Sequence, residues 1–594
     1  MKKIIELLND ELKAAFSACG YDEKYAKVVV SNRPDLCQYQ CNGCMAAAKE
    51  YKKAPAIIAG EVVEKLAESS TFSKVEAVNP GFINMNLSGQ FIADYVKEMG
   101  SHEKFGCDET KKNKTIMLDY GGANVAKPLH VGHLRPAIIG ESLKRICAYN
   151  GYDTVGDVHL GDWGLQMGLI IMELKNRKPE LPYFDESFTG EYPAEAPFTL
   201  AELEEIYPCA SRKSKEDAEF AEEAHQATVM LQRGHRGYTA IWKHIMNISI
   251  ADLKRNYDNL NVSFDVWKGE SDAKPYIEDM LKSFVDKGYA YESQGALVID
   301  VAQADDKKEI PPCIVRKSDG AALYATTDLA TMIEREKLYH PFKYIYTTDK
   351  RQEMHFTQIF RAAKKTGIVP QDTEMDFLGF GTMNGKDGKP FKTRNGDLLR
   401  LEYLIKDVED AVYNKIKENR DVADDEARAT AKVVGLAAIK YGDLSNQASK
   451  DYIFDIDRFT SFEGDTGPYV LYTIVRIKSI LNKYEQTYGA QSLSVADRMK
   501  DFVAPEGTSE TDLCLLLTKF SEVIESAYTE LAPHKICKFI YDVANVFNSF
   551  YHDTKILSEE DEKKRSSYIA LITLTKSILE TCTDLLAIKV PDRM

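Results

Sequence analysis

Residues Thr115–Gly164 read TIMLDYGGANVAKPLHVGHLRPAIIGESLKRICAYNGYDTVGDVHLGDWG, and their pattern indicates an α/β protein. The first of these residues, Thr115–Asp119, form a short apolar run typical of a buried strand, and Asp153–His159 is a second such run. Between them, apolar residues recur at helical spacing: Leu134, Ile138, Ile139, Leu143 and Ile146. The pattern predicts a β–α–β unit with parallel strands, in which ligands bind beyond the carboxyl ends of the strands.

The tetrapeptide His130-Val131-Gly132-His133 stands where the predicted helix begins. A helix N-terminus presents unpaired N–H groups and a partial positive charge, which suits a nucleotide phosphate. Two other interpretations stay open at this point, a surface pair of histidines and half of a zinc site. Pro136 is tolerated only in the first turn of a helix, so we expect the helix to start close to His133.

The tetrapeptide resembles the H-I-G-H signature of class I aminoacyl-tRNA synthetases. The longer strings Ala123–Arg135 and His159–Gly164 resemble the arginyl-tRNA synthetase family, and later segments extend this resemblance over nearly the whole chain. It implies a multidomain α/β protein with a Rossmann-like, parallel-sheet catalytic domain that carries an insertion. A small α+β domain would precede it, and an all-α anticodon-binding bundle would follow.

The resemblance and the changes in composition along the chain predict the domain limits. Residues 1–108 form an N-terminal domain, which in the family contacts the tRNA, and residues 109–400 form the catalytic domain, with a connective insertion at about 176–290. A helical junction at 401–455 and an anticodon-binding domain at 456–594 complete the chain.

Composition bounds the class of protein. The formal charge of −16 over 594 residues argues against indiscriminate nucleic-acid binding but leaves a specific RNA partner open. There is no apolar run of about 18 residues, so we expect a cytoplasmic protein without a membrane partner. Cys37, Cys41 and Cys44 suggest zinc, but no second pair of ligands lies nearby, and buried thiols are the favoured interpretation.

Two local predictions concern the later part of the chain. Pro312–Lys317 and Ala321–Tyr324 flank a Ser-Asp-Gly turn and are predicted to pair as a hairpin. Further on, Glu510–Leu531 is predicted to form one helix of the C-terminal bundle.

The basic, glycine-rich segment Asn384–Gly396 lacks the spacing of a P-loop and suits a flap over polyphosphate. Judged alone, it is an exposed basic loop. Its five residues Pro390–Arg394 stand where class I synthetases carry K-M-S-K-S, with a threonine at the second lysine. In the family a lysine just before the histidine signature is thought to substitute, and Lys127 stands there. The resemblance therefore implies the following catalytic residues: His130, His133, Lys127, Lys392 and Arg394.

A guanidinium group is a planar fork of five donors, best recognised by carboxylates. Family positions for binding arginine match Asp119, Asn124, Tyr324, Asp328 and Gln352. We expect Asp119 and Asp328 to bind the guanidinium group, Tyr324 and Gln352 to shape the pocket and Asn124 to hold the α-amino end. Singly, either aspartate could be a helix cap or a surface charge.

The resemblance also implies the remaining sites. ATP would lie against His130, Gly132, His133, Gly161, Asp162, Trp163 and Gly164, accompanied by Mg²⁺ without a dedicated protein metal site. The anticodon loop of tRNA(Arg) would contact Tyr469, Tyr472, Tyr551 and Met594, although aromatic residues at helical spacing are as often core. The chain is expected to act as a monomer.

Two rival functions fit the sequence less well. A non-catalytic protein that binds RNA or arginine is disfavoured, because both histidines, Lys127 and the basic segment occur in one chain. A cysteinyl-tRNA synthetase would need zinc-binding thiols in the crevice, where this chain supplies carboxylates.

Overall fold

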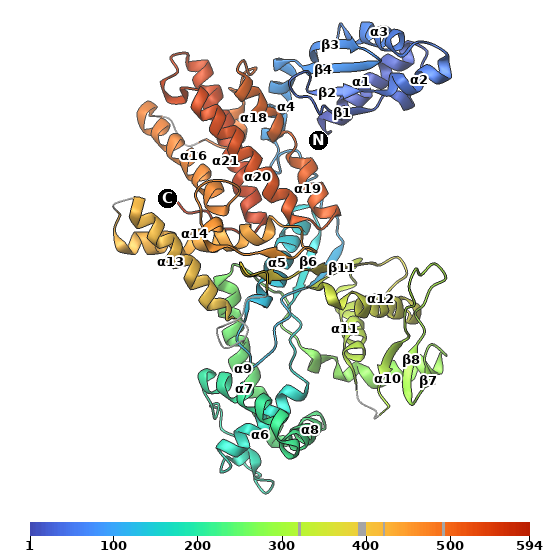
Figure 1. The fold of residues 1–594 in the computed structure, drawn as a ribbon, viewed down its shortest axis with the longest axis vertical. Coiled ribbons are helices and arrows are strands. Elements are labelled where there is room, and N and C mark those ends of the chain that lie inside the picture. The colour runs from blue at the N-terminus through green and yellow to red at the C-terminus, as the bar shows by residue number, and fades with distance from the viewer. Residues whose placement is uncertain (319–321, 390–398, 420–421, 490–492) are drawn as a thin grey trace.

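The computed structural model describes residues 1–318, 322–389, 399–419, 422–489 and 493–594. The molecule is elongated, with the N-terminal domain at one end and the helices that follow the first β–α–β unit at the other (Figure 1). The parallel sheet and the C-terminal helices lie between them. The predicted fold class, α/β with a helical C-terminal bundle, is confirmed.

The N-terminal domain is a four-stranded antiparallel sheet with helices packed on it, in the strand order β1-β2-β4-β3. Its strands are β1 (Val28–Val30), β2 (Tyr39–Cys41), β3 (Phe72–Val78) and β4 (Phe82–Leu87). Its helices are α1 (Ile4–Ala18), α2 (Gly43–Tyr51), α3 (Pro55–Leu66) and α4 (Gly89–Ser101), the last of which leads to the rest of the molecule. Cys37, Cys41 and Cys44 are buried.

The central sheet is parallel throughout, in the order β11-β10-β5-β6, as the sequence predicts. Its strands are β5 (Thr115–Asp119), β6 (Asp153–Asp157), β10 (Lys343–Asp349) and β11 (Glu374–Phe380). Helix α5 (Leu134–Tyr149) connects β5 to β6, and Pro136 lies in its first turn. Successive residues of β5 face opposite sides of the sheet, so that Ile116 and Leu118 belong to one hydrophobic core and Met117 to another.

The chain between β6 and the next strand is largely helical. It contains α6 (Leu165–Arg177), α7 (Leu200–Glu216), α8 (Ala218–Gln232), α9 (Arg236–Asn259) and α10 (Lys274–Asp286). A small antiparallel sheet follows, made of β7 (Tyr291–Ser293), β8 (Ala296–Ile299) and β9 (Cys313–Arg316). Helices α11 (Tyr324–Tyr339) and α12 (Glu353–Thr366) then cover the face of the central sheet on which Met117 lies.

The predicted hairpin around the Ser-Asp-Gly turn is wrong. Strand β9 pairs with β8, which precedes it in the chain, and Tyr324 begins helix α11. The apolar residues that end at Tyr324 therefore lead into a helix start, where Leu323 N–H donates to the hydroxyl of Thr326.

Among the C-terminal residues that the structure describes, the regular elements are helices apart from a short parallel pair of β12 (Met383–Asn384) and β13 (Tyr452–Ile453). Its helices are α13 (Leu401–Asn419), α14 (Asp424–Leu444), α15 (Ile456–Phe459), α16 (Gly467–Tyr488), α17 (Val495–Met499), α18 (Thr508–Leu517), α19 (Phe520–Thr529), α20 (Pro533–Asp553) and α21 (Glu562–Leu585). The single helix predicted over Glu510–Leu531 is in fact two, because the chain turns at Thr518–Lys519 between α18 and α19.

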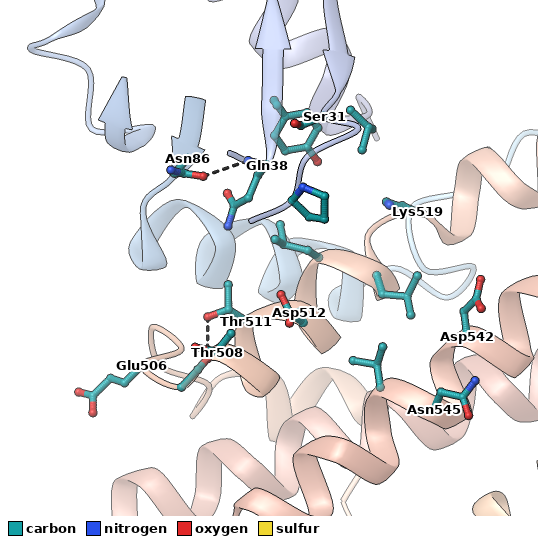
Figure 2. Close-up of a pocket in the computed structure, with 17 residues that line it drawn as sticks. Ser31, Gln38, Asn86, Glu506, Thr508, Thr511, Asp512, Lys519, Asp542 and Asn545 are labelled. Atoms are coloured by element: carbon teal, nitrogen blue, oxygen red, sulfur yellow. Dashed lines mark hydrogen bonds between the residues drawn. The ribbon is translucent and has the colours of Figure 1, made fainter. Parts of the chain in front are cut away.

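A cavity of about 600 Å³ lies between the N-terminal domain and helices α18 and α20 (Figure 2). Ser31, Gln38 and Asn86 line it from the N-terminal side, and Asp512 and Asn545 are among the residues that line it from the bundle. The two bodies thus meet around a polar gap at this point. Within the described ranges, no helix is both long and apolar enough to cross a bilayer.

Candidate active site

The two signature histidines lie together at the start of α5. A single 3₁₀ turn, Val131–His133, leads directly into the helix. The two rings are 3.9 Å apart between centroids. The backbone N–H of Gly132 donates to Nδ1 of His130 at 3.0 Å, and the N–H of His130 donates to Nδ1 of His133 at 3.1 Å. These bonds fix both imidazoles at the helix N-terminus.

The local environment keeps both imidazoles neutral. Burial, with Lys127 next, lowers the pKa of His130. Burial, with His130 and Lys127 next, lowers the pKa of His133 to about 3. Because Nδ1 of each ring accepts a hydrogen bond, the ring proton of the neutral form resides on Nε2. Each histidine therefore offers one Nε2–H donor in addition to the N–H groups of the helix end.

Lys127 lies near both histidines, since its charge lowers the pKa of each. Its Nζ stands 4.5 Å from the centre of the Tyr207 ring on α7, a cation–π contact. The preceding residue, Ala126, has a left-handed backbone (φ 59°), and its N–H donates to Ser249 on α9. The insertion helices thus hold the segment that carries Lys127.

The segment of the predicted basic loop rejoins the described part of the fold beside the histidines. On its C-terminal side the N–H of Val131 donates to the carbonyl of Leu399 at 3.0 Å, and the N–H of Leu401 donates to Leu129 at 2.9 Å. On its N-terminal side, β12 pairs with β13. Lys392 and Arg394 themselves lie outside the described residues.

Arg135, two residues after His133, fastens the N-terminal stem of this loop to α5. Its side chain is 2% exposed. Nε donates to Oδ2 of Asp443 on α14 at 2.9 Å, and Nη1 donates to the carbonyls of Gly381 at 2.6 Å and Lys450 at 3.2 Å. Burial raises the pKa of Asp443, and the charge of Arg135 opposes this shift. One buried cation therefore joins α5 to the segments just before β12 and β13.

The Gly161–Gly164 loop lies against the end of the first β–α segment. Gly161 forms a parallel bridge with Asn124, and a β-carbon on Gly161 would stand 2.2 Å from Oδ1 of Asn124, so a larger residue here would displace the Asn124 side chain. Asp162 is buried, and both of its oxygens accept from Ser271, from the backbone N–H at 3.0 Å and from the hydroxyl at 2.6 Å. Its carboxylate therefore shapes the loop. Trp163 packs edge-on against Trp242, and Gly164 caps α6.

Asp119 is predicted to bind the guanidinium group of the substrate, but in the structure it binds the guanidinium group of Arg335. Nη2 of Arg335 on α11 donates to Oδ2 of Asp119 at 2.6 Å and to Oδ2 of Asp157 at 2.7 Å. The hydroxyl of Tyr346 accepts from Nη1 at 2.9 Å. The local pattern around Asp119 gives no sign of this partner, which is 216 residues away in the chain.

Asp328 lies in the first turns of α11, where Oδ2 is 2.6 Å from Nε2 of His355 on α12. Tyr324 lies one helical turn before Asp328, and Gln352 lies one turn before His355. The contact between Asp328 and His355 therefore brings the N-terminal ends of both helices together. Tyr324 is 74% exposed, and Gln352 is exposed.

Glu270 is a residue that the sequence analysis missed. It begins a 3₁₀ turn after Gly269, and its N–H donates to the carbonyl of Leu160 at 3.1 Å. Burial raises the pKa of its carboxyl to about 7, Asp162 and Asp328 add to the rise, and His159 opposes it. Glu270 and Asp328 thus lie near enough to repel each other, and a cation bound between them would relieve that repulsion. The sole local signal was a turn after glycine, which is common in any loop.

The aromatic residues predicted to contact RNA lie on α16 and α20. The guanidinium of Arg476 stands 4.8 Å from the ring centre of Tyr472 and 5.4 Å from that of Tyr551, which is 42% exposed. Tyr472 and Met594 line one cavity of about 560 Å³. Tyr469 is bound within the bundle, because its hydroxyl donates to Asn545 at 2.7 Å.

A parallel sheet with an H-x-G-H turn at the start of its first crossover helix, joined to a helical bundle, defines a class I aminoacyl-tRNA synthetase. Residues 96–456 match the model of the tRNA synthetases class I (R) catalytic domain. Residues 2–87 match the arginyl tRNA synthetase N terminal domain, and residues 470–594 match the DALR anticodon binding domain. The chain belongs to the arginyl-tRNA synthetase family.

Individual relatives agree with this assignment. The arginine–tRNA ligase of Agathobacter rectalis is 60% identical over 602 aligned residues, and that of Alkaliphilus oremlandii is 55% identical over 594. Each alignment covers 100% of both chains. The crystal structure of Plasmodium falciparum arginyl-tRNA synthetase has the same fold, with a TM-score of 0.79 at 24% identity and full coverage of both chains.

Proposed function

We propose that the chain is an arginine–tRNA ligase. It activates L-arginine with ATP to give arginyl-adenylate and pyrophosphate, and it then transfers the arginyl group to the 3′ end of tRNA(Arg). The observation that carries this proposal is the joint placement of neutral histidines at the helix N-terminus and carboxylates at the ends of neighbouring elements. The first group suits phosphate and the second suits a guanidinium group.

Activation requires the carboxylate of arginine to attack the α-phosphorus of ATP. We propose that the Nε2–H groups of His130 and His133 donate to phosphate oxygens, where negative charge grows in the transition state. Lys127 adds a positive charge at the same end of the helix, and Lys392 and Arg394 would assist from the basic loop. The protein thus acts by positioning and by electrostatic stabilisation.

The guanidinium group of the substrate is assigned to Asp328 together with Glu270. This differs from the pair expected from the sequence, because Asp119 is paired with Arg335. Tyr324 and Gln352, at the starts of α11 and the turn before α12, line the pocket, and Asn124 holds the α-amino end. Lysine is rejected because a point charge cannot satisfy two carboxylates in the way a fork does.

The adenosine of ATP is assigned to Gly132 and to the Gly161–Gly164 loop. Asp162 supports that loop through Ser271, and Trp163 offers a ring beside it. Within the described ranges, no cluster of His, Cys, Asp or Glu is arranged to hold a metal ion. We therefore propose that Mg²⁺ enters with ATP and is held mainly by phosphate oxygens and water.

Anticodon bases are assigned to the surface around Tyr472, Tyr551 and Met594. Splayed bases stack on aromatic rings, and Arg476 between two of those rings provides charge for the backbone. Tyr469 would act by holding α16 against α20. A monomeric state and a cytoplasmic location stay predictions.

ATP–pyrophosphate exchange tests the activity, with each amino acid in turn and with or without tRNA. Asp328→Ala should abolish exchange with arginine, whereas Asp306→Ala should retain it, because Asp306 pairs with Arg361 and with none of the residues assigned to the site. Far-ultraviolet circular dichroism would show that both variants are folded. Near-normal exchange by Asp328→Ala would refute the assignment of Asp328 to the arginine pocket. Exchange with cysteine instead of arginine would refute the assignment as an arginine–tRNA ligase.

A further inference from the structure

A guanidinium-binding site exists inside the protein and is filled by one of its own side chains, Arg335, whose Nη1 and Nη2 are hydrogen-bonded while its Nε has no partner among the described residues. Arg335 is 3% exposed, and it donates to Asp119, to Asp157 and to the hydroxyl of Tyr346. Two carboxylates and a hydroxyl around one planar cation are the groups that a free guanidinium ion would also select.

The sheet itself creates this site. Asp119 and Asp157 are register partners at the carboxyl ends of β5 and β6, and Tyr346 is the register partner of Asp119 on β10. Three adjacent parallel strands therefore present acidic or hydroxyl side chains at one edge, which is the edge where ligands bind in such sheets. Without a cation, the two carboxylates would repel each other and attract a cationic ligand.

Arg335 shares a helix face with the carboxylate assigned to the substrate. Asp328 precedes it by two helical turns on α11, so the two side chains are separated by about 10 Å along the helix. Asp119 and Asp328 both act on Tyr346, where burial first and then these carboxylates raise the pKa, against the charge of Arg335. The internal site and the proposed substrate site are thus neighbours along one helix.

We infer that Arg335 is a specificity-determining positioning residue: it fills the Asp119–Asp157 carboxylate pair with its own guanidinium group and so leaves Glu270 and Asp328 as the carboxylates for the substrate. This inference rests on the proposed function for the identity of the substrate. The occupancy of the internal site by a guanidinium group can be tested without it.

The first test separates the two carboxylate assignments. Asp119→Asn should change the arginine KM in pyrophosphate exchange by less than about threefold, whereas Asp328→Asn should raise it by about tenfold or more. Equal increases for both variants would overturn the inference, because Asp119 would then contact the substrate. Both substitutions conserve shape, so this test does not depend on a large cavity being tolerated.

The second test is chemical rescue. Arg335→Ala should lower kcat/KM for arginine by about tenfold or more, and ethylguanidinium should restore activity and raise the Tm, whereas ethylammonium should not. Arg361→Ala is the matched control, since Arg361 lies on α12 and forms a fork-shaped pair with Asp306, which is not part of the internal site. It should keep the arginine KM, and its Tm should not respond to ethylguanidinium.

Failure of rescue, or an Arg335→Ala variant with unchanged kinetics, would refute the role of Arg335. If the unsubstituted protein shows no exchange with arginine, the proposed function fails instead. If ethylguanidinium raises the Tm of Arg335→Ala without restoring activity, the internal guanidinium site is still supported. If the Tm does not rise, the internal site is refuted.

Discussion

Arginine binding should weaken steeply below about pH 7, because Glu270 must be ionised to pair with a guanidinium group. With a pKa of about 7, its ionised fraction falls from about nine-tenths at pH 8 to about one-tenth at pH 6. The arginine affinity should fall by about tenfold over this range, which corresponds to about 1.4 kcal/mol. The sign follows from the charge: protonation removes the negative partner of the ligand, so acid opposes binding.

Isothermal titration calorimetry with arginine measures this effect directly. Near pH 7 about half a proton should leave the protein per arginine bound, which appears as a dependence of the binding enthalpy on the ionisation enthalpy of the buffer. His133, with a pKa of about 3, is neutral throughout and does not contribute.

Glu270→Gln should bind arginine weakly, with an affinity that no longer changes between pH 6 and about pH 8. Glu510→Gln is the matched control, because burial also raises the pKa of Glu510, which lies on α18 in the bundle. Its profile should follow that of the unsubstituted protein. A pH-independent arginine affinity in the unsubstituted protein would refute the assignment of Glu270 to the guanidinium group.

Three further outcomes follow from the site. Lys127→Ala should lower kcat for pyrophosphate exchange by about 100-fold with little change in the arginine KM; an effect confined to KM would contradict its placement at the phosphates. His133→Gln, which keeps an N–H donor, should retain about tenfold more exchange activity than His133→Leu, and equal losses would exclude the donor role. Asp443→Ala should reduce the free energy of unfolding by about 3–5 kcal/mol in urea titrations, because it leaves Arg135 buried without its carboxylate. A loss below about 1 kcal/mol would show that water or a rearrangement compensates.

The parallel sheet and the helix after the histidine signature could be predicted from local pattern. Apolar periodicity located β5, α5 and β6, and Pro136 placed the start of the helix within its first turn. Such features depend on residues a few positions apart, which is the range over which a sequence pattern carries information. The arrangement of the two histidines is also a local feature that sequence can predict, since its geometry is set by backbone donors within the tetrapeptide.

Pairings between distant elements could not be predicted in this way. Asp119 has the same local context whether it binds a substrate or Arg335, and only the packing of α11 on the sheet decides between them. Glu270 stands in an ordinary turn until Asp328 is brought near it. The failed hairpin at Tyr324 is a local error, because a short apolar run after a Ser-Asp-Gly turn is compatible with either a strand or the approach to a helix.

The Arg135–Asp443 pair bears on how this protein can be dissected. A fragment that ends at residue 400 would contain the whole parallel sheet and both histidines, yet it would lack α14 and with it the carboxylate that compensates Arg135. Such a fragment would carry an uncompensated guanidinium in its interior beside the first turn of α5. Minimal catalytic fragments of this protein should therefore extend past β13. If the chain is cut after residue 400, the two pieces should recover activity only when they associate with each other.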